Sequence, residues 1–362
     1  MKARIAYLPG DGIGAEVLAE ARKVLEVIAS EHNHTFEFVE ADIGAIAIDR
    51  HKDPFPKATE EICLASNAVL LGAVGHPKYD HLPPSKRAEG GLLRMRTVLG
   101  NFANLRPVVV PEALVDSSPL RKEIVQGSDL VIVRELLGGI YFGRPRGSEE
   151  ELAYNTEIYT RDEVKRVAKV AFGLAMHRRK QVCSVDKANV LESSQLWRDA
   201  VAEVAKEFKE VKLTNMYVDN CAMQIIARPQ QFDVIVTNNM FGDILSDEAS
   251  MLPGSLGLLP SASIGGKVGL YEPIHGSAPD ITGKGIANPL GAISSAAMLL
   301  EHSLKLHHEA TKIERAVVKV LARGYRTADL KHRGHGATKE KMVSTKEMGE
   351  MVCDFIKTPD AT

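Results

Sequence analysis

Residues Arg4–Ile28 have the sequence RIAYLPGDGIGAEVLAEARKVLEVI, which contains one strand, one turn and one helix in succession. The apolar run Arg4–Leu8 predicts a strand, and the apolar spacing from Val17 to Ile28 predicts a helix with one buried face. Glycines at positions 10, 12 and 14 predict a tight turn between them. A strand, turn and helix in this order is the repeating unit of α/β proteins.

The spacing of these glycines leaves two explanations open. GxGxG differs from the GxGxxG of a dinucleotide-binding turn, and no acidic residue follows at a strand end about 20 residues further on. Glycine is equally suited to a turn in which a side chain would collide with neighbouring backbone. The turn is therefore either a nucleotide contact or a steric requirement.

The alternation of short apolar runs and amphipathic stretches continues along the chain and predicts an α/β fold class. The runs Ala68–Val74 and Leu130–Val133 are typical of strands buried on both faces. Further strands are predicted at Gln181–Val185, Lys212–Val218 and Phe232–Val236. Helices are predicted at Arg161–His177, around Leu196–Phe208, after Asp219, and near Ala287–Leu306, Ile313–Arg323 and Thr345–Ile356.

Length and charge limit the classes of protein that remain. The 362 residues correspond to about 2.4 domains, and 44% apolar with 25% charged residues is ordinary for a folded protein. Lys and Arg number 45 against 47 Asp and Glu, which argues against nucleic acid or an anionic membrane as a partner.

The cysteines and the first residues predict a cytoplasmic protein. The four cysteines are far apart and form no CxxC pair, so we expect free thiols rather than disulfides or a zinc site. The first apolar run reaches Pro9 after only a few residues, which is too short for a signal peptide. Apolar runs such as Ala68–Val74 are also far shorter than a membrane span, so we expect no membrane partner.

The segment NMFGDILSD, residues 239–247, gives the strongest local signal. It follows an apolar strand and places Asp243 and Asp247 four residues apart at the start of a helix, where both carboxylates face the same way. Two hard oxygen ligands on one face suit Mg²⁺ or Mn²⁺, and Asp219, at a neighbouring strand end, is a candidate third ligand. The alternative is that these acids stabilise helix dipoles.

Three arginines, Arg96, Arg106 and Arg134, lie at the ends of predicted elements. An arginine at the tip of an apolar strand needs an anion, and its planar fork matches a carboxylate. Converging arginines would suit a di- or tricarboxylate substrate, although a single such arginine is more often part of a structural ion pair.

Two further residues are candidates for proton transfer. Lys187 follows an apolar strand, and a lysine beside a metal and shielded from water can act as a base. Tyr141 lies among glycines, which allow a ligand to approach its hydroxyl. The alternatives are a surface lysine and a packed tyrosine.

The segment Pro273–Ile281 is rich in small residues and has no strand alternation. Exposed amides, a hydroxyl and the Asp280 carboxylate in one loop would suit a nucleotide, with amides on phosphate and the carboxylate on ribose hydroxyls. An ordinary surface loop is the alternative.

Together these motifs resemble the isocitrate/isopropylmalate dehydrogenase family of β-hydroxyacid oxidative decarboxylases. The resemblance covers nearly the whole chain. It is carried by Leu8–Gly14, Asn104–Pro107, Arg134–Gly143, Asp186–Leu191, the segment with Asp243 and Asp247, and His275–Pro289.

The resemblance implies a two-domain α/β fold with a shared central sheet and without a Rossmann site. Residues 1–101 and 255–362 would form a cofactor-side domain containing both termini. Residues 102–254 would form a middle domain with the metal ligands and the interface of a homodimer with shared active sites.

Particular roles are also implied. Arg96, Arg106 and Arg134 would bind substrate carboxylates, Lys187 would be the general base reaching across the dimer interface, and Tyr141 would donate a proton. The metal, Mg²⁺ or Mn²⁺, would be held by Asp219 of one subunit and by Asp243 and Asp247 of the other. The adenine half of NAD would contact His275, Gly276, Ser277, Ala278, Pro279, Asp280, Ile281 and Asn288.

The implied reaction is the oxidation and decarboxylation of (2R,3S)-3-isopropylmalate by NAD, giving 4-methyl-2-oxopentanoate and CO₂ for leucine biosynthesis. Glu89, Leu92, Leu93 and Val190 would bind the substrate side chain, because aliphatic residues stand where isocitrate-type relatives carry a polar patch. Asp280 and Ile281 favour NAD over NADP.

His76 and Tyr79 depart from the glycine and tryptophan usual in the family, so we expect local cofactor contacts and packing to differ there. Two other functions remain as alternatives. One is a tartrate- or D-malate-type decarboxylating dehydrogenase, which would share these residues. The other is a non-catalytic regulator that binds a metal or nucleotide.

Overall fold

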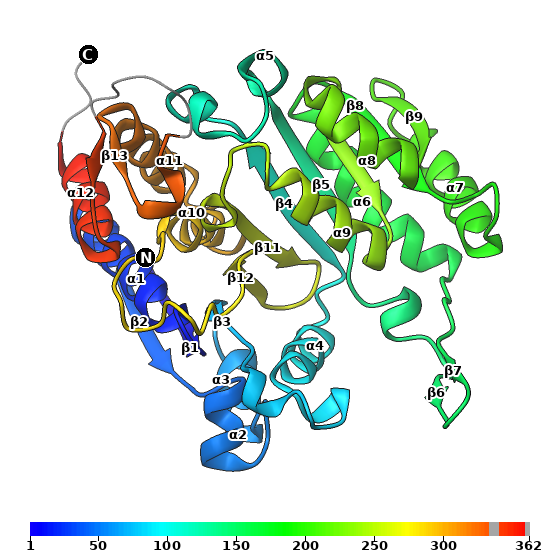
Figure 1. Cartoon of the computed structure of the whole chain (residues 1–362), viewed down its shortest axis with the longest axis horizontal. Coiled ribbons are helices and arrows are strands. Elements are labelled where there is room, and N and C mark those ends of the chain that lie inside the picture. The colour runs from blue at the N-terminus through cyan, green and yellow to red at the C-terminus, as the bar shows by residue number, and fades with distance from the viewer. Residues whose placement is uncertain (333–339, 359–362) are drawn as a thin grey trace. The chain divides into compact units, whose positions relative to one another are not determined.

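The computed structural model describes residues 1–332 and 340–358 and divides into two compact units (Figure 1). Unit 1 comprises Met1–Asn101, Pro111–Ser117 and the residues from Gly254 onward. Unit 2 comprises Phe102–Val110 and Ser118–Pro253. Among the described residues, no helix is long and apolar enough to cross a membrane.

Unit 1 contains five neighbouring strands. The four strands β2, β1, β3 and β12 are parallel, and β11 is antiparallel to β12. In sheet order they are β2 (Thr35–Glu40), β1 (Lys2–Gly10), β3 (Ala68–Ala73), β12 (Gly269–Pro273) and β11 (Pro260–Ile264). Every residue of β3 is buried, so the prediction of a strand covered on both faces is confirmed. A second small sheet pairs β13 (Tyr325–Arg326) with β14 (Lys341–Met342).

The helices of unit 1 form two groups. One group packs together and consists of α1 (Gly14–Glu31), α10 (Leu290–Leu299), α11 (His307–Ala322) and α12 (Thr345–Lys357). The other consists of α2 (Ala45–His51), α3 (Lys57–Leu64) and α4 (Ala88–Leu99). The predicted apolar face of α1, from Val17 to Ile28, is buried. The helix predicted near Ala287–Leu306 begins at Leu290, directly after Pro289, whose fixed φ suits a helix start.

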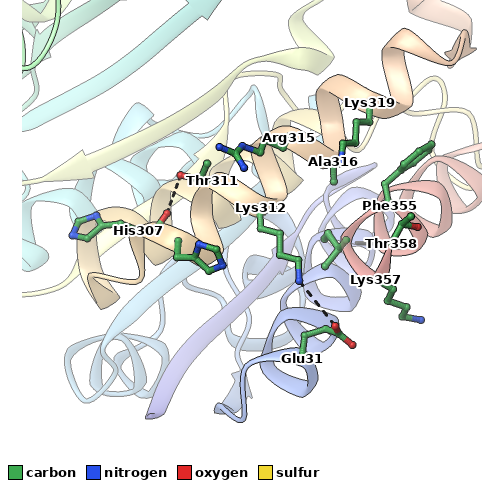
Figure 2. Close-up of a pocket in the computed structure, with 12 residues that line it drawn as sticks. Glu31, His307, Thr311, Lys312, Arg315, Ala316, Lys319, Phe355, Lys357 and Thr358 are labelled. Atoms are coloured by element: carbon green, nitrogen blue, oxygen red, sulfur yellow. Dashed lines mark hydrogen bonds and ion pairs between the residues drawn. The ribbon is translucent and has the colours of Figure 1, made fainter. Parts of the chain in front are cut away.

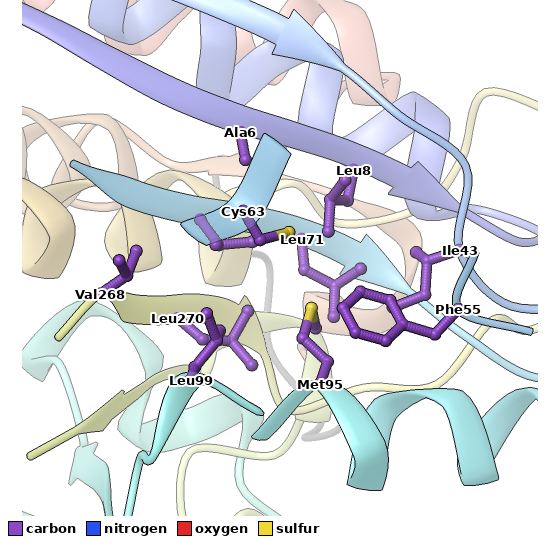
Figure 3. Packing of buried hydrophobic residues seen from close by; sticks show 11 residues of the cluster. Ala6, Leu8, Ile43, Phe55, Cys63, Leu71, Met95, Leu99, Val268 and Leu270 are labelled. Carbon is purple, nitrogen blue, oxygen red and sulfur yellow. The ribbon is translucent and has the colours of Figure 1, made fainter. Parts of the chain in front are cut away.

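The strands of unit 1 and its second helix group enclose an apolar core (Figure 3). Leu8, Leu71 and Leu270 from three strands meet Met95 and Leu99 of α4 in this core. Ala6, Ile43, Phe55, Cys63, Val69 and Val268 complete the cluster. All four cysteines of the chain are buried, and burial raises the pKa of the Cys63 thiol to about 12.

The turn Gly10–Gly14 is shaped by close backbone contacts. Gly10 and Gly12 have positive φ angles of 70° and 56°. A Cβ on Gly10 would lie 1.9 Å from the Ala73 carbonyl oxygen, and one on Gly12 would lie 2.0 Å from that of Ser277. The steric explanation therefore accounts for both glycines.

A basic groove of about 580 Å³ borders α11 and the C-terminal ends of α1 and α12 (Figure 2). It is lined mainly by side chains of α11, and Lys312 Nζ lies 4.0 Å from Glu31 Oε2. None of the predicted site residues lines this groove.

Unit 2 also contains five neighbouring strands. They are β4 (Ala103–Val109), β5 (Asp129–Glu135), β10 (Val234–Thr237), β8 (Gln181–Asp186) and β9 (Lys212–Tyr217), in sheet order. β4 is antiparallel to β5, and the others are parallel. The helices are α5 (Lys122–Val125), α6 (Arg161–Met176), α7 (Glu192–Ala205), α8 (Val218–Ala227) and α9 (Asn239–Ala249). A short hairpin pairs β6 (Gly147–Ser148) with β7 (Ala153–Tyr154).

The register of unit 2 aligns the carboxyl ends of its parallel strands. Arg134 on β5 is opposite Thr237 on β10, which is opposite Val185 on β8. Because β4 is antiparallel, its Asn104 is opposite Arg134 at the same edge. This edge therefore collects residues from separate parts of the sequence.

The segment Pro111–Ser117 belongs to unit 1. It was expected in the middle domain, because the predicted boundary lies at residue 102. Two contacts within unit 1 explain this. The Ser117 hydroxyl donates to the Leu330 carbonyl at 3.0 Å, and Arg326 Nη2 donates to the Ala113 carbonyl at 2.6 Å.

Candidate active site

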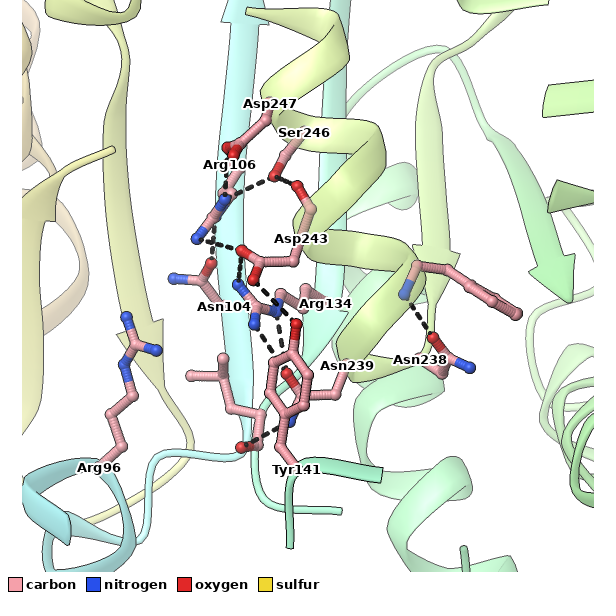
Figure 4. A network of polar contacts seen from close by, with 12 residues as sticks. Arg96, Asn104, Arg106, Arg134, Tyr141, Asn238, Asn239, Asp243, Ser246 and Asp247 are labelled. Carbon is pink, nitrogen blue, oxygen red and sulfur yellow. Dashed lines mark hydrogen bonds and ion pairs between the residues drawn. The ribbon is translucent and has the colours of Figure 1, made fainter. Parts of the chain in front are cut away.

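Arg134 projects from the carboxyl end of β5 into a polar network with α9 (Figure 4). Its Nη1 donates to Asp243, and its Nε and Nη2 donate to Asn239 Oδ1 at 3.1 and 2.8 Å. The side chain is only 3% exposed. Asn239 is itself fixed, because its amide donates to the carbonyls of Leu136 and Gly138.

Arg106 on β4 faces the same helix. Its Nε donates to Asn104 Oδ1 at 2.7 Å, and its Nη1 donates to Ser246 Oγ at 2.5 Å. Its guanidinium lies 3.5 Å from both an Asp243 and an Asp247 carboxylate oxygen. The prediction that the two aspartates share one face is confirmed by this common partner.

The position of the two aspartates within α9 differs from the expected one. α9 begins at Asn239, so Asp243 and Asp247 lie one and two turns further along rather than at the helix start. Stabilisation of the helix dipole falls off within the first turn and so does not explain them. The start is capped instead by Asn238, whose Oδ1 accepts from the Phe241 amide at 2.8 Å.

Tyr141 belongs to the same network. Its hydroxyl donates to Asp243 Oδ2 at 3.2 Å, and the Arg134 guanidinium carbon lies 5.8 Å from its ring centre. Burial and the Asp243 charge raise the pKa of Tyr141, so its hydroxyl keeps its proton at neutral pH. The structure thus places a protonated phenol beside two arginines and a carboxylate.

Lys187 and Asp219 form a second cluster. Lys187 follows β8, and its Nζ donates to Asp219 Oδ1 at 2.5 Å. This contact lowers the pKa of the Asp219 carboxyl. Asp219 lies in the first turn of α8 and not at the end of β9, because the helix begins at Val218.

The two clusters lie on different strands of the same edge in unit 2. The first belongs to β4, β5 and α9, the second follows β8 and β9, and β10 lies between β5 and β8. Within residues 1–332 and 340–358, no three His, Cys, Asp or Glu side chains come together as a metal site. A single chain therefore brings Asp243 and Asp247 together but does not add Asp219 to them.

Arg96 lies in unit 1, on α4. Its Nη2 donates to Glu272 Oε1 at 2.7 Å, and both side chains are buried. Its Nε is buried and has no partner within the described chain. Arg96 is thus held in an ion pair in this structure.

The residues expected around the substrate side chain lie in both units. Glu89, Leu92 and Leu93 are on α4, and Leu92 packs against the core of unit 1. Val190 follows β8 in unit 2 and is 65% exposed.

The predicted cofactor residues form a loop in unit 1, His275–Asn288, which we call the cofactor loop. His275 Nδ1 lies 2.9 Å from the Gly276 carbonyl, and burial lowers the pKa of the ring, so it is neutral and donates from Nδ1. Its Nε2 is buried without a partner in the described part of the chain and is available as an acceptor. Pro279 and Asp280 are exposed.

Asn288 closes the loop. Its Nδ2 donates to Asp329 Oδ2 at 3.0 Å, and its Oδ1 accepts from the Leu290 amide at 3.0 Å. Both ends of this amide are therefore occupied by protein contacts, and Asn288 orders the loop next to α10.

The two unusual residues of the segment 75–80 have local partners. The Tyr79 hydroxyl donates to Asp49, which also accepts from Lys78 Nζ at 2.7 Å. His76 Nδ1 accepts from the Lys78 amide at 3.1 Å. The tyrosine thus joins this segment to α2.

Asn104, Asn239 and Ser246 were not among the predicted site residues, although they orient both arginines. A signal was present for two of them. Asn104 precedes Arg106 by two residues and so shares its face of the strand. Asn239 precedes Asp243 by four and so shares its face of the helix.

The class of protein follows from this fold and site. Residues 4–352 match the family model described as isocitrate/isopropylmalate dehydrogenase, and the chain belongs to this family. It is an oxidoreductase with an α/β fold, as predicted from its sequence. Among solved structures, it is similar to isocitrate dehydrogenase from Methylococcus capsulatus, with a TM-score of 0.85, 33% identity and coverage of 98% of this chain and 100% of that one. The apo β-decarboxylating dehydrogenase from Thermococcus kodakarensis matches with a TM-score of 0.79, 34% identity and coverage of 98% and 96%.

Relatives with higher sequence identity share one name, 3-isopropylmalate dehydrogenase. The chain is 57% identical to the 3-isopropylmalate dehydrogenase of Thermotoga maritima over 97% of its own length and 98% of that protein. It is 55% identical to the 3-isopropylmalate dehydrogenase of Sulfurimonas denitrificans, with the same coverage.

Proposed function

We propose that the chain catalyses the NAD-dependent oxidative decarboxylation of (2R,3S)-3-isopropylmalate to 4-methyl-2-oxopentanoate and CO₂, a step of leucine biosynthesis. The observation that carries this proposal is the convergence of Arg106, Arg134 and Tyr141 on the same carboxylate, Asp243. The names of the relatives support the choice of substrate.

Substrate binding is assigned to the arginines. Arg106 and Arg134 are nearly fully buried, and a bidentate carboxylate would be recognised by their planar forks. Arg96 is proposed as a third contact from unit 1, and Glu272 keeps its charge compensated in the free protein. Glu89, Leu92, Leu93 and Val190 are proposed to surround the isopropyl group, since three of the four are aliphatic.

The carboxylates suit a divalent cation. Asp247 is 62% exposed and Asp243 is 36% exposed, so their oxygens are accessible although both lie near arginines. Hard oxygen donors are those that Mg²⁺ and Mn²⁺ prefer. We assign Asp243 and Asp247 of one subunit and Asp219 of a second subunit to this cation.

The chain supplies the proton transfers. Lys187 accepts the proton of the substrate C2 hydroxyl, and Asp219 orients its amine. Tyr141, which burial keeps protonated, donates to C3 after CO₂ is lost. When bound, the cation supplies electrophilic stabilisation at the C2 oxygen and NAD⁺ supplies the hydride acceptor.

The cofactor loop of unit 1 is proposed to bind the adenine half of NAD. The buried His275 Nε2 has no protein partner among the described residues and suits a donor such as an exocyclic amine. Asp280 is exposed and suits the two ribose hydroxyls, whereas it would repel the additional phosphate of NADP.

A homodimer with shared active sites is part of the proposal. It is supported by the separation of Asp219 from Asp243 and Asp247 within one chain. Exposed apolar side chains on the adjoining helices α8 and α9, Met223 and Ile244, offer a surface that a second subunit would cover. The four buried thiols are consistent with a cytoplasmic location.

The decisive experiment is an NADH-formation assay with 3-isopropylmalate, isocitrate, D-malate and tartrate, each with Mn²⁺ and with EDTA. We expect the highest kcat/KM with 3-isopropylmalate and no activity in EDTA. A higher kcat/KM with D-malate or tartrate would replace the proposed substrate, and no turnover with any of the four would contradict the enzyme assignment.

A further inference from the structure

Glu16, in the first turn of α1, is bonded to the far part of the cofactor loop. Its Oε1 accepts from the Gly283 amide at 2.5 Å, and its Oε2 accepts from the Gly285 amide at 3.1 Å. Each carboxylate oxygen thus accepts a hydrogen bond from one backbone amide. Hydrogen bonds to a charged acceptor are stronger than those between neutral groups. Glu16 has no role in the function proposed above.

The same stretch of sequence supports the near part of the loop. The Ile13 amide donates to the Ser277 carbonyl at 2.8 Å, and Gly12 leaves room for that carbonyl because it has no Cβ. The turn Gly10–Gly14 and Glu16 therefore hold the loop at Ser277 and again at Gly283 and Gly285. On α12, the Thr345 amide donates to the Gly285 carbonyl at 2.9 Å and provides a third attachment.

The segment between these attachments contains residues that are proposed to bind the cofactor. Ala278 has a positive φ of 39°, which costs a non-glycine residue conformational energy and must be imposed by the surroundings. In the described part of the chain, the Asp280 carboxylate has no hydrogen-bond or ion-pair partner of its own. Its position is therefore set by the backbone that the attachments hold.

We infer that Glu16 is a positioning residue for dinucleotide binding. By holding the amides of Gly283 and Gly285, its carboxylate keeps the backbone of Ala278–Ile281 in the conformation that receives the adenosine half of NAD. This inference rests on the proposed function. It also gives the glycine-rich turn a role, because the Ile13 amide of that turn holds the Ser277 carbonyl of the cofactor loop.

A simpler explanation is that Glu16 only stabilises the positive end of the α1 dipole. Glu16→Asp separates the two roles. It keeps the negative charge at the helix start, but its side chain is one methylene shorter and cannot reach both amides. Glu16→Gln keeps the length and loses the charge. Glu26→Asp is the matched control, because Glu26 is on the same helix in an exposed ion pair with Arg22.

The experiment measures by calorimetry the Kd of NAD⁺ and of ADP-ribose, which lacks the nicotinamide. Melting temperatures show that each variant is folded. We expect both Glu16 variants to bind both ligands roughly tenfold more weakly, the equivalent of about one lost hydrogen bond to a charged group. We expect Glu26→Asp to match the wild type and the Kd of 3-isopropylmalate with Mn²⁺ to stay unchanged throughout. Hydrogen exchange at Gly283 and Gly285 should become faster only in the Glu16 variants.

Two results would count against these assignments in different ways. Wild-type protein that binds NAD⁺, together with Glu16→Asp protein that binds it equally well, would overturn the inference and leave the proposed function standing. Wild-type protein that binds neither NAD⁺ nor ADP-ribose would overturn the proposed function and the inference with it.

Discussion

Gly242 of α9 lies directly against the side chain of Arg134. A methyl group on residue 242 would be 2.7 Å from both the Cβ and the Cγ of Arg134, closer than such atoms come in folded proteins. Glycine at this position is what allows α9 to approach β5. The close approach in turn lets Arg134 reach Asp243 and Asn239.

Gly242→Ala tests this relationship. We expect displacement of the Arg134 guanidinium and a fall in kcat/KM for 3-isopropylmalate of at least about tenfold, since small misplacements of binding groups are costly. The control is Gly173→Ala on α6, where a Cβ meets nothing within 4 Å. That change should stabilise the protein by about 0.5–1 kcal/mol and leave kinetics unaltered. Normal kinetics in Gly242→Ala would contradict the argument.

Lys187→Ala removes the proposed base. Turnover should fall by roughly 10²–10⁴-fold, the usual contribution of general base catalysis, while calorimetry should still detect 3-isopropylmalate. Lys169→Ala is a suitable control, because Lys169 is in an exposed ion pair with Glu207. Turnover within a few-fold of the wild type in Lys187→Ala would show that another group takes the proton.

His275 gives a pH dependence with a defined sign. Burial lowers the pKa of its ring below the usual 6.5, so folding favours the neutral form. The neutral ring of His275 therefore contributes to the free energy of unfolding above pH 6.5. This contribution is lost as the pH falls from 6.5 through the lower pKa that His275 has in the folded protein. Between about pH 7.5 and 5.5, calorimetry should show a smaller fall in Tm for His275→Gln than for the wild type.

The same scans need a comparison with other histidines. Burial also lowers the pKa of His32 and His302, so part of the fall in Tm will remain in His275→Gln. If Tm falls equally with pH in the wild type and in His275→Gln, His275 does not contribute to the pH dependence of stability.

Asp280→Lys tests the preference for NAD. The substitution replaces an acceptor for ribose hydroxyls with a cation, so we expect the KM for NAD to rise at least about tenfold and the KM for NADP to fall. Steady-state kinetics with both cofactors at saturating 3-isopropylmalate measures this. An unchanged KM for NAD would remove Asp280 from the site.

Sequence periodicity predicted the elements that bury a continuous apolar face or run. The strand Ala68–Ala73 and the helix that begins at Gly14 are examples, because burial alone determines their patterns. Helix starts were less accurate. α8 takes in Val218, whose β-branched side chain suits the preceding strand equally well, and this moved Asp219 from a strand end into a helix.

Pairwise contacts in the site were only partly predictable. The four-residue spacing of Asp243 and Asp247 sufficed to put them on one face, which their shared partner Arg106 bears out. The partners of Arg96 and Glu16 are 176 and 267 or more residues away, and no local pattern encodes such pairs. They depend on the tertiary fold.

The attachment of the cofactor loop to both α1 and α12 has a consequence for the order of events during synthesis. The strands of unit 2 have all been made once residue 253 has left the ribosome, so its sheet can form while the chain is still growing. Unit 1 at that moment still lacks β11, β12 and its last three helices. The loop is fully attached only after Thr345 has emerged, so the proposed dinucleotide site is completed later in synthesis than the sheet of unit 2.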